Sequence, residues 1–234
     1  MGNDKKILKI GGSLIFDDDV AVKKEKISNF IDLIKKSKSK VDCVVVGGGK
    51  VARIYINAYR DLKDNQAIQD ELGIKVSRLN ALLLASLVGP DVAYQGVPES
   101  IEELVKVKSM VPDKIVFLGG MEIGQSTTSV ACQAAESLGA DSLVIGTDVD
   151  GIYTADPDKN PDAKKLDEVT LQEVAKILKL SSAGNQAAGE YRIFDNVSLG
   201  IISRSKIPIR IVLGDIQTLE SALSGKKVGT LIKA

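Results

Sequence analysis

The chain has 234 residues, of which 44% are hydrophobic and 26% are charged, so it can bury a sizeable core. Its 31 lysines and arginines balance its 31 aspartates and glutamates, which argues against a surface built for nucleic acid or an anionic membrane. It has no histidine, which excludes histidine general bases, histidine-containing catalytic triads and most zinc sites. Phosphoryl transfer remains compatible, because it works largely by positioning and electrostatic stabilisation.

The two cysteines indicate a reducing compartment. Cys43 and Cys132 lie in apolar segments and show no metal-ligand spacing, so we expect buried thiols in a cytoplasmic protein. The apolar run at residues 81–89 is far shorter than a membrane span, and residues 1–10 lack the apolar stretch of a secretory signal. We therefore expect no membrane association.

Strand and helix patterns alternate along the first half of the chain. Short apolar runs predict strands, whereas residues 23–38 place Ile27, Phe30, Ile31 and Ile34 at helical spacing. Strands are expected at residues 6–10, 41–46, 91–95 and 115–118, and helices at residues 23–38, 50–62, 66–87, 101–107 and 128–138.

The second half of the chain continues the alternation. Strands are expected at residues 142–145, 208–213 and 228–232, and helices at residues 171–180, 191–203 and 219–223. Such alternation predicts an α/β fold with a mostly parallel sheet and helices on both of its faces. Because no linker interrupts the pattern, we predict a single domain over residues 1–234.

Three of the predicted strands end in glycine-rich loops, at residues 11–13, 47–49 and 119–120. Glycine lets backbone N–H groups approach an anion without interference from a Cβ atom, and the N-terminus of a following helix adds partial positive charge. A single loop of this kind is as well explained by helix packing. Three of them together favour phosphate binding.

The second loop also formally satisfies a dinucleotide-binding fingerprint, through Gly47, Gly49 and Ala52. That fingerprint requires an acidic residue about twenty positions further on, at the end of the next strand. Asp70 has this spacing, but residues 61–71 are polar and offer no strand that could end there. The dinucleotide interpretation is therefore weak.

Cationic residues accompany the first two loops. Lys9 directly precedes the first loop, where a lysine could neutralise a transferring phosphoryl group. Lys50 and Arg53 follow the second loop, and the planar fork of arginine suits bidentate contact with phosphate. Lys50 is followed by Val51, so the loop is not a Walker A sequence, and Lys50 is equally well explained as a solvated surface lysine.

A fourth loop follows the strand predicted at residues 142–145. Glycines and aspartates collect at residues 146–151, at the carboxyl end of a strand, where ligands bind in open α/β sheets. Ile152 and Tyr153 then offer an apolar and an aromatic surface, and the loop closes with polar residues and a turn. This mixture suits a purine-type ring, a ribose and a metal-bound phosphate. On composition alone, an ordinary surface loop is an equal alternative.

Six segments stand in a specific order along the chain: KIGGS at residues 9–13, GGGKVAR at 47–53, Asp70 with LGI at 72–74, SRLNA at 77–81, GQST at 124–127 and TDVDGIYTADP at 147–157. In this order they resemble the archaeal-type uridylate (UMP) kinases of the amino acid kinase superfamily. The resemblance implies a three-layer α/β/α sandwich and transfer of the γ-phosphate of ATP to UMP, giving UDP for pyrimidine nucleotide biosynthesis. It also implies Mg²⁺ with the ATP and a homohexameric assembly.

The same resemblance implies which residues bind the two nucleotides. Those expected to meet ATP are Lys9, Ile10, Gly11, Gly12, Ser13, Gly49, Arg53, Thr147, Tyr153 and Asp156. Those expected to meet UMP are Gly48, Asp70, Met121, Glu122, Ile123, Gly124, Gln125, Ser126 and Thr127. The N-terminal half would then mainly bind UMP and the C-terminal half mainly ATP. Physically, Asp70 can accept hydrogen bonds from ribose hydroxyls.

The chain departs from the family pattern at two positions. Many relatives carry an aspartate just after the paired Ser and Thr of the third loop, where this chain has Thr128. Many also carry a lysine in the late helix, where this chain has Gly200. Phosphoryl transfer would then rest on Lys9 and Arg53 as catalytic cations, with magnesium and backbone N–H groups.

Three alternatives stay open at this point. Isopentenyl phosphate kinases share the TDVDGIY loop, but they place a histidine before the second glycine loop, and this chain has none. Acetylglutamate and aspartate kinases phosphorylate carboxylates and lack the GGGKVAR arrangement. A non-catalytic nucleotide or anion sensor would keep the fold and lose the chemistry, and Thr128 and Gly200 are the residues in its favour.

Overall fold

A seven-stranded sheet forms the middle layer of the protein, in a computed structural model that describes residues 4–17, 19–155, 160–181 and 193–233. The strands lie in the order β3-β2-β1-β4-β8-β9-β7. Their bounds are β1 (Lys6–Ile10), β2 (Val41–Val46), β3 (Val116–Leu118), β4 (Ser142–Thr147), β7 (Glu168–Thr170), β8 (Ile209–Leu213) and β9 (Thr230–Lys233). Every neighbouring pair in this sheet is parallel except β8 and β9, which are antiparallel.

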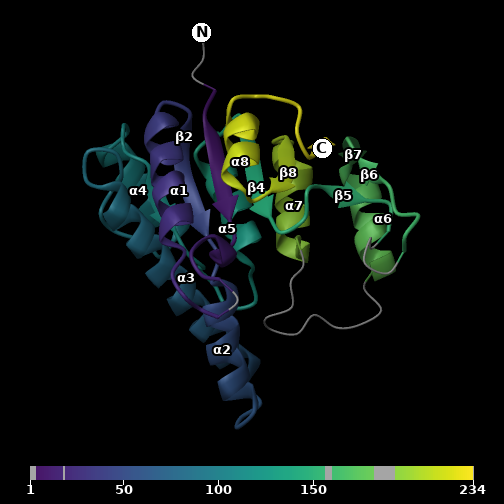
Figure 1. The fold of residues 1–234 in the computed structure, drawn as a ribbon, viewed down its shortest axis with the longest axis horizontal. Coiled ribbons are helices and arrows are strands. Elements are labelled where there is room, and N and C mark those ends of the chain that lie inside the picture. Colours follow the sequence, from purple (N-terminus) through teal and green to yellow (C-terminus); the bar gives the residue numbers. More distant parts are fainter. Residues whose placement is uncertain (1–3, 18, 156–159, 182–192, 234) are drawn as a thin grey trace.

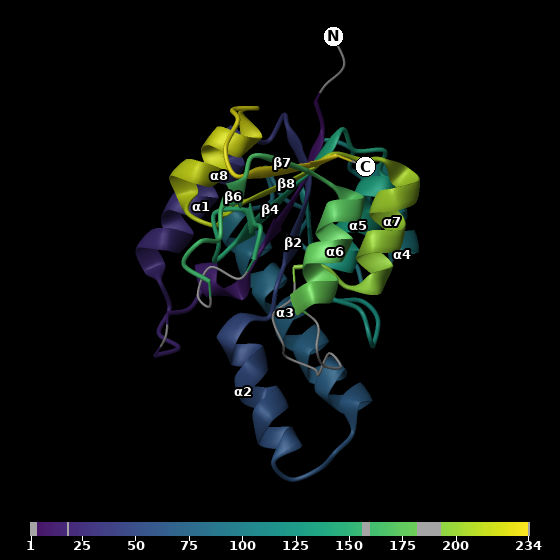
Figure 2. The ribbon, with the colours of Figure 1, turned by 90° about the vertical axis from the view of Figure 1, so that its right-hand side faces the viewer.

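Helices cover both faces of the sheet, as Figures 1 and 2 show. Helices α4, α5, α6 and α7 pack on one face, and α1, α3 and α8 pack on the other. The helices are α1 (Lys24–Lys36), α2 (Gly49–Arg60), α3 (Gln66–Val88), α4 (Ile101–Met110), α5 (Thr127–Ser137), α6 (Leu171–Ser181), α7 (Asn196–Ser205) and α8 (Ile216–Leu223), with a 3-10 turn η1 (Gly12–Leu14). The predicted three-layer α/β/α sandwich with a mainly parallel sheet is therefore confirmed. Within the described residues, no helix combines the length and apolarity needed to cross a membrane.

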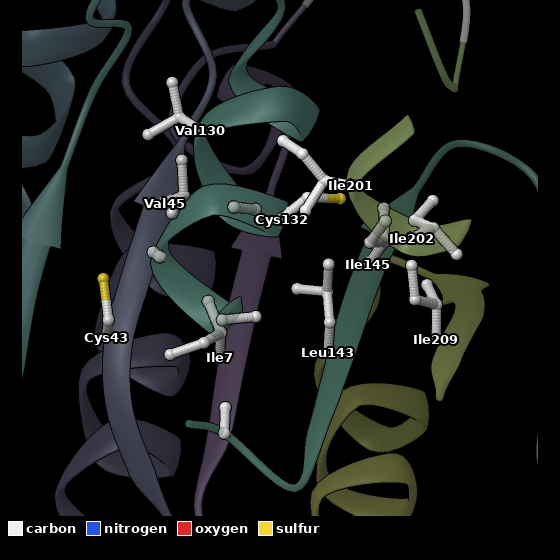
Figure 3. Packing of buried hydrophobic residues seen from close by; sticks show 14 of the residues in the cluster. Ile7, Cys43, Val45, Val130, Cys132, Leu143, Ile145, Ile201, Ile202 and Ile209 are labelled. Carbon is white, nitrogen blue, oxygen red and sulfur yellow. The ribbon is translucent and has the colours of Figure 1, made fainter. Parts of the chain in front are cut away.

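Two apolar cores result, one on each face of the sheet, because side chains alternate along a strand. In β1, Ile7 belongs to the core under α5 and α7, whereas Leu8 and Ile10 belong to the core under α1, α3 and α8. Figure 3 shows the core under α5 and α7, to which Cys132 of α5 and Ile7 of β1 both belong, together with side chains from the neighbouring strands. Both cysteines are buried, as predicted, and burial raises the pKa of the Cys132 thiol to about 12.

Helix α2 and the first part of α3 project beyond the edge of the sheet at which β1 ends (Figures 1 and 2). They pack on each other through a small separate cluster of three buried residues, Ala52, Ile56 and Val76. Val51 and Leu72 are partly buried against this cluster. The two helices therefore form an arm, which is joined to the sheet mainly through the second half of α3. Residues of that half belong to the core that α1, α3 and α8 cover.

The prediction of a strand at residues 91–95 is wrong. Only one bridge forms there, between Ala93 and Ile115, and the ladder does not continue. The side-chain amide of Gln95 instead donates hydrogen bonds to the carbonyls of Ala85 and Ala93. Three short strands had not been predicted: β7, and the antiparallel hairpin of β5 (Ile152–Tyr153) and β6 (Lys165–Leu166).

Two of the late helices begin at capping aspartates rather than where apolar spacing placed them. Asp195 caps α7, because its carboxylate accepts a hydrogen bond from the backbone N–H of Ser198 at 2.7 Å. The helix predicted over 191–203 therefore begins at 196, and residues 191 and 192 lie outside the described residues. Asp215 caps α8 in the same way through Thr218, so this helix begins three residues earlier than 219.

Candidate active site

The first two glycine loops pack directly on each other at the carboxyl ends of β1 and β2. The N–H of Gly47 donates to the carbonyl of Ile10 at 2.9 Å. A Cβ atom on Gly12 would lie 2.6 Å from the amide nitrogen of Gly49, a distance that real Cβ contacts do not show. Gly49 has a φ of +63°, a conformation that glycine adopts without strain. The backbones of the two loops are therefore in direct contact, with no side chain between them.

Helix α3 fixes the second loop. Asn80 is buried, and its side-chain amide donates to the carbonyls of Gly47 and Gly48 at 3.0 and 3.3 Å. These two carbonyls therefore point toward α3, so they would not repel an anion that binds at the loop. Asn80 stood within one of the segments that carry the family resemblance, but no role had been predicted for it. Its signal in the sequence is a polar residue on the core-facing side of a helix.

The same helix holds the start of the third loop. The hydroxyl of Ser77 accepts a hydrogen bond from the N–H of Gly120 at 2.8 Å, and the guanidinium of Arg78 donates to the carbonyl of Gly120 at 2.9 Å. A Cβ atom on Gly119 would lie 2.5 Å from the backbone nitrogen of Arg78. Arg78 also forms an ion pair with Glu99 at 2.5 Å. The third loop is thus fixed by contacts that require glycine at its first position.

Asp70, on the arm, reaches the outer part of the third loop. Its Oδ2 accepts a hydrogen bond from the N–H of Gly124 at 2.8 Å, and Gly124 has a φ of +78°. The side chain of Met121 is only 7% exposed and belongs to the core, whereas that of Ile123 is 55% exposed. Of the residues predicted to meet UMP, those at 121–127 lie along the third loop and the start of α5, and this loop contacts Asp70 through Gly124, whereas Gly48 lies on the second loop. Met121 is buried in the core.

Asp195 joins the end of the third loop to α7. Its carboxylate accepts hydrogen bonds from the N–H of Ser126 at 2.9 Å and from the hydroxyl of Ser129 at 2.5 Å, besides capping α7. Burial opposes ionisation of this carboxylate, but the hydrogen bonds from Ser129, Ser198 and Ser126 outweigh it and lower its pKa. Thr128, one of the two departures from the family pattern, is buried in the first turn of α5.

Lys9 is a lysine inside the sheet. It pairs with Val45 on one side and Ile145 on the other, and its side chain is almost fully buried, on the same face of β1 as Ile7. Burial lowers the pKa of its ammonium from 10.5 to about 8, and the carboxylate of Asp148 partly opposes this effect. At neutral pH Lys9 therefore carries a charge that is poorly solvated, which suits it to bind an anion strongly.

The fourth loop, which follows β4, is anchored by β9, two strands away from β4 in the sheet. The hydroxyl of Thr230 in β9 accepts a hydrogen bond from the N–H of Ile152 at 2.8 Å, which fixes the β5–β6 hairpin. On that hairpin, the hydroxyl of Tyr153 donates to Asp150 at 2.7 Å, and this hydrogen bond together with one from Lys165 lowers the pKa of Asp150. Asp156, predicted to meet ATP, lies outside the described residues.

A pocket of about 300 Å³ opens between the first loop, the fourth loop and the starts of α1 and α8. Four of the residues predicted to meet ATP line it, namely Ile10, Gly11, Ser13 and Thr147, and none of those predicted to meet UMP does. Lys9, Gly12, Gly49, Arg53 and Tyr153 do not line it.

The pocket also contains residues that the sequence did not single out. Lys23, Lys26 and Asp215 line it, together with Asp148. The two lysines belong to the start of α1 and the aspartate to the cap of α8, so tertiary structure alone brings them to the glycine loop. No motif or periodicity distinguished them from other surface charges.

Comparisons with known proteins agree with this architecture. Residues 4–213 match the model of the amino acid kinase family. The chain belongs to this family. The predicted membership of the amino acid kinase superfamily is thereby confirmed.

Within the family, similar proteins are uridylate kinases of archaea. The uridylate kinase of Thermofilum pendens is 39% identical over 236 residues, which cover 97% of both chains. That of Methanocaldococcus jannaschii is 37% identical over 229 residues, covering 97% of this chain and 98% of the relative. The crystal structure of uridylate kinase from Archaeoglobus fulgidus superimposes with a TM-score of 0.82 at 33% identity, covering 97% of this chain and 99% of that one.

The packing of the first two loops predicts that Gly12→Ala destabilises the protein. The added Cβ meets backbone atoms that cannot move aside, so we expect the free energy of unfolding to fall by about 2 kcal/mol or more in urea denaturation. Gly200→Ala is the matched control, because its Cβ meets nothing within 4 Å on α7. It should raise stability by about 0.5–1 kcal/mol through helix propensity. Equal effects of the two substitutions would contradict the tight packing.

The burial of Lys9 predicts that Lys9→Met stabilises the protein at neutral pH. A fall of the lysine pKa from 10.5 to about 8 corresponds to a cost on the order of 3 kcal/mol for keeping the buried charge. Between these two pH values the unfolded chain binds more protons than the folded one, so wild-type stability rises with pH. The advantage of the variant should therefore be largest below pH 8 and vanish near pH 10.5.

Urea denaturation at a series of pH values measures this advantage. Lys24→Met, at an exposed lysine, serves as the control and should differ little from wild type at any pH. An advantage of Lys9→Met that does not change between pH 7 and 10.5 would argue against a titrating, buried ammonium.

Proposed function

We propose that the chain is a uridylate kinase that transfers the γ-phosphate of ATP to UMP and releases UDP and ADP. The observation that carries the proposal is the similarity to archaeal uridylate kinases over 97% of the chain. The geometry supports it, because three glycine loops, a buried lysine and an aspartate-rich loop meet at one edge of the sheet. An isopentenyl phosphate or carboxylate acceptor has no comparable support.

The reaction is a direct, in-line transfer. A phosphate oxygen of UMP attacks the γ-phosphorus of ATP, and the bond from that phosphorus to the oxygen bridging it to the β-phosphate breaks, leaving ADP. Lys9 lies beneath the loops and would stabilise negative charge on the transferring group, more strongly because its surroundings exclude water. Arg53 is exposed near the start of α2, and its guanidinium would contact phosphate in a bidentate way. Backbone N–H groups of the packed glycine loops complete the set.

The two nucleotides would be divided between the halves of a single domain spanning residues 1–234. UMP would lie between Asp70 and residues 121–127, with Gly48 beneath it, and the C-terminal half would mainly bind ATP. Asp70 gives one carboxylate oxygen to Gly124, while its other oxygen accepts no hydrogen bond from any described residue. That oxygen is available for a ribose hydroxyl of UMP.

Mg²⁺ would accompany the ATP. This ion prefers oxygen ligands and is commonly held by one or two carboxylates together with substrate phosphates. Asp148 and Asp215 line the pocket with the hydroxyl-bearing residues Ser13 and Thr147, so the donor set fits. Among the described residues no group of three or more His, Cys, Asp or Glu side chains could hold a metal without the nucleotide. The ion would neutralise charge on the phosphates, and the two aspartates would hold it.

The protein would act in the cytoplasm, in pyrimidine nucleotide biosynthesis, as a homohexamer. The assembly is supported by large apolar side chains left exposed on α3: Leu79 is 65%, Leu82 41% and Leu87 45% exposed. Leu79 and Leu82 are three residues apart and share one side of the helix, where a second copy of the chain would cover them. The mass of the protein in solution, by light scattering, tests the hexamer directly.

The acceptor is tested by a coupled assay with magnesium-ATP and four acceptors in parallel: UMP, CMP, isopentenyl phosphate and acetylglutamate. We expect conversion of UMP, because Asp70 and the third loop offer polar groups for a ribose and a pyrimidine base. Turnover of another acceptor alone would keep the ATP half and discard UMP. Binding of nucleotide without turnover of any acceptor would favour the non-catalytic sensor and point to Thr128 and Gly200.

The roles of Lys9 and Asp70 predict opposite kinetic defects. Lys9→Met should lower kcat by about 100-fold or more with little change in the KM for UMP, because its charge acts on the transferring group. Asp70→Asn should raise the KM for UMP about 10-fold and affect kcat less, because it loses a charged hydrogen-bond acceptor. Steady-state kinetics with each substrate varied separates these effects. Equal losses in both parameters for both variants would overturn this division of roles.

A further inference from the structure

The pocket beside the first glycine loop is not formed by that loop alone. Its walls come from four places in the chain: the first loop, the end of β4, the turn between β8 and α8, and the start of α1. Its volume of about 300 Å³ is at the lower end of the range for ligand pockets. It therefore suits part of a nucleotide rather than a whole one.

Two lysines of α1 reach this pocket because of their spacing. Lys23 is the N-cap of α1, and Lys26 lies three residues further on, so both side chains fall on one face of the helix. The ammonium of Lys23 donates a hydrogen bond to the carbonyl of Ser13 at 3.1 Å, which places its charge at the first glycine loop. Lys24 lies between them, is exposed, and does not line the pocket.

The charges in the pocket are not paired with one another. Among the residues that the structure describes, neither Lys23 nor Lys26 forms an ion pair with a carboxylate. Each of the two carboxylates has a hydrogen-bond donor of its own. Asp148 accepts from the hydroxyl of Thr147 at 2.9 Å, and Asp215 accepts from the N–H of Thr218 at 2.9 Å. Two cations thus line the pocket without pairing with either carboxylate, and the remaining carboxylate oxygens are available to hold Mg²⁺.

We propose that Lys23 and Lys26 bind the polyphosphate of ATP and make the affinity of the pocket depend on the number of phosphates. The inference rests on the proposed use of ATP as the phosphoryl donor. The acceptor is not the ligand here, since no residue of the third loop and no part of Asp70 lines the pocket. Lysine acts on phosphate as a point charge, so two lysines discriminate among ATP, ADP and AMP by charge rather than by shape.

The test is isothermal titration of the 234-residue chain with magnesium-ATP, magnesium-ADP, AMP and UMP. Lys23→Met and Lys26→Met are combined in one variant, because methionine keeps the length of the side chain and removes its charge. We expect magnesium-ATP to bind at least 10-fold more weakly, magnesium-ADP to lose less, and AMP and UMP to change less than 2-fold. Lys24→Met is the matched control and should bind all four nucleotides as the wild type does.

Replacing both lysines by arginine keeps the charges and should restore the affinity for magnesium-ATP. The proposal is overturned if the double methionine variant binds magnesium-ATP as Lys24→Met does, or if it loses ATP, AMP and UMP equally, which would indicate a structural defect. Wild-type protein that binds ATP in this lysine-dependent way yet does not phosphorylate UMP would support the inference and refute the proposed function. Wild-type protein that binds no ATP would refute both.

Discussion

The two hydrogen bonds from Asn80 to the carbonyls of Gly47 and Gly48 set the position on which the rest of the site depends. They attach the second glycine loop to α3, and the first loop lies against the second with no room for a side chain between them. Ser77 and Arg78, on the same helix, attach the third loop. Each of these contacts involves backbone on one side, and the close approaches at Gly12 and Gly119 leave no space for a Cβ atom, so the relative positions of the loops depend on glycine at these places. The carboxyl edge of the sheet is thus preorganised before any ligand arrives.

Electrostatics at this edge follow from burial. Lys9 occupies a strand position that would ordinarily hold an apolar residue, between Val45 and Ile145. An ammonium there is costly for the fold but effective for chemistry, because few water molecules compete with a phosphate for it. Lys23 and Lys26 represent the opposite arrangement, since they sit on a helix surface and their charge is less costly to keep. The site thus combines one buried charge with a large desolvation penalty and two charges at its rim with a small one.

Much of the fold could be predicted from the sequence, and what was missed has identifiable causes. The long elements could be identified from the sequence. A continuous apolar run predicted β2, and apolar residues at helical spacing over several turns predicted α3. The β5–β6 hairpin was missed because strands of two residues carry no periodic signal. The start of α7 was placed too early because apolar spacing continues upstream of its cap, and the cap at Asp195 decides where helical hydrogen bonding begins.

For the site, glycine loops could be recognised because their chemistry is local: a glycine after a strand and before a helix. The residues that hold those loops could not, because Asn80 and Ser77 reach them only through the packing of α3 on the sheet, 33 and 43 residues away in sequence. Lys23 lies nearer in sequence, but its part in the pocket depends on how α1 docks.

The small cluster between α2 and α3 has a consequence for how ligands stabilise the protein. Only Ala52, Ile56 and Val76 are buried in it, so the arm can open locally at a much lower free energy than the sheet with its two large cores. Arg53 and Asp70 both belong to this arm. A nucleotide held by them would therefore close the arm by mass action, and amide hydrogen exchange along α2 would slow with ligand concentration while exchange in β1 and β4 would hardly change.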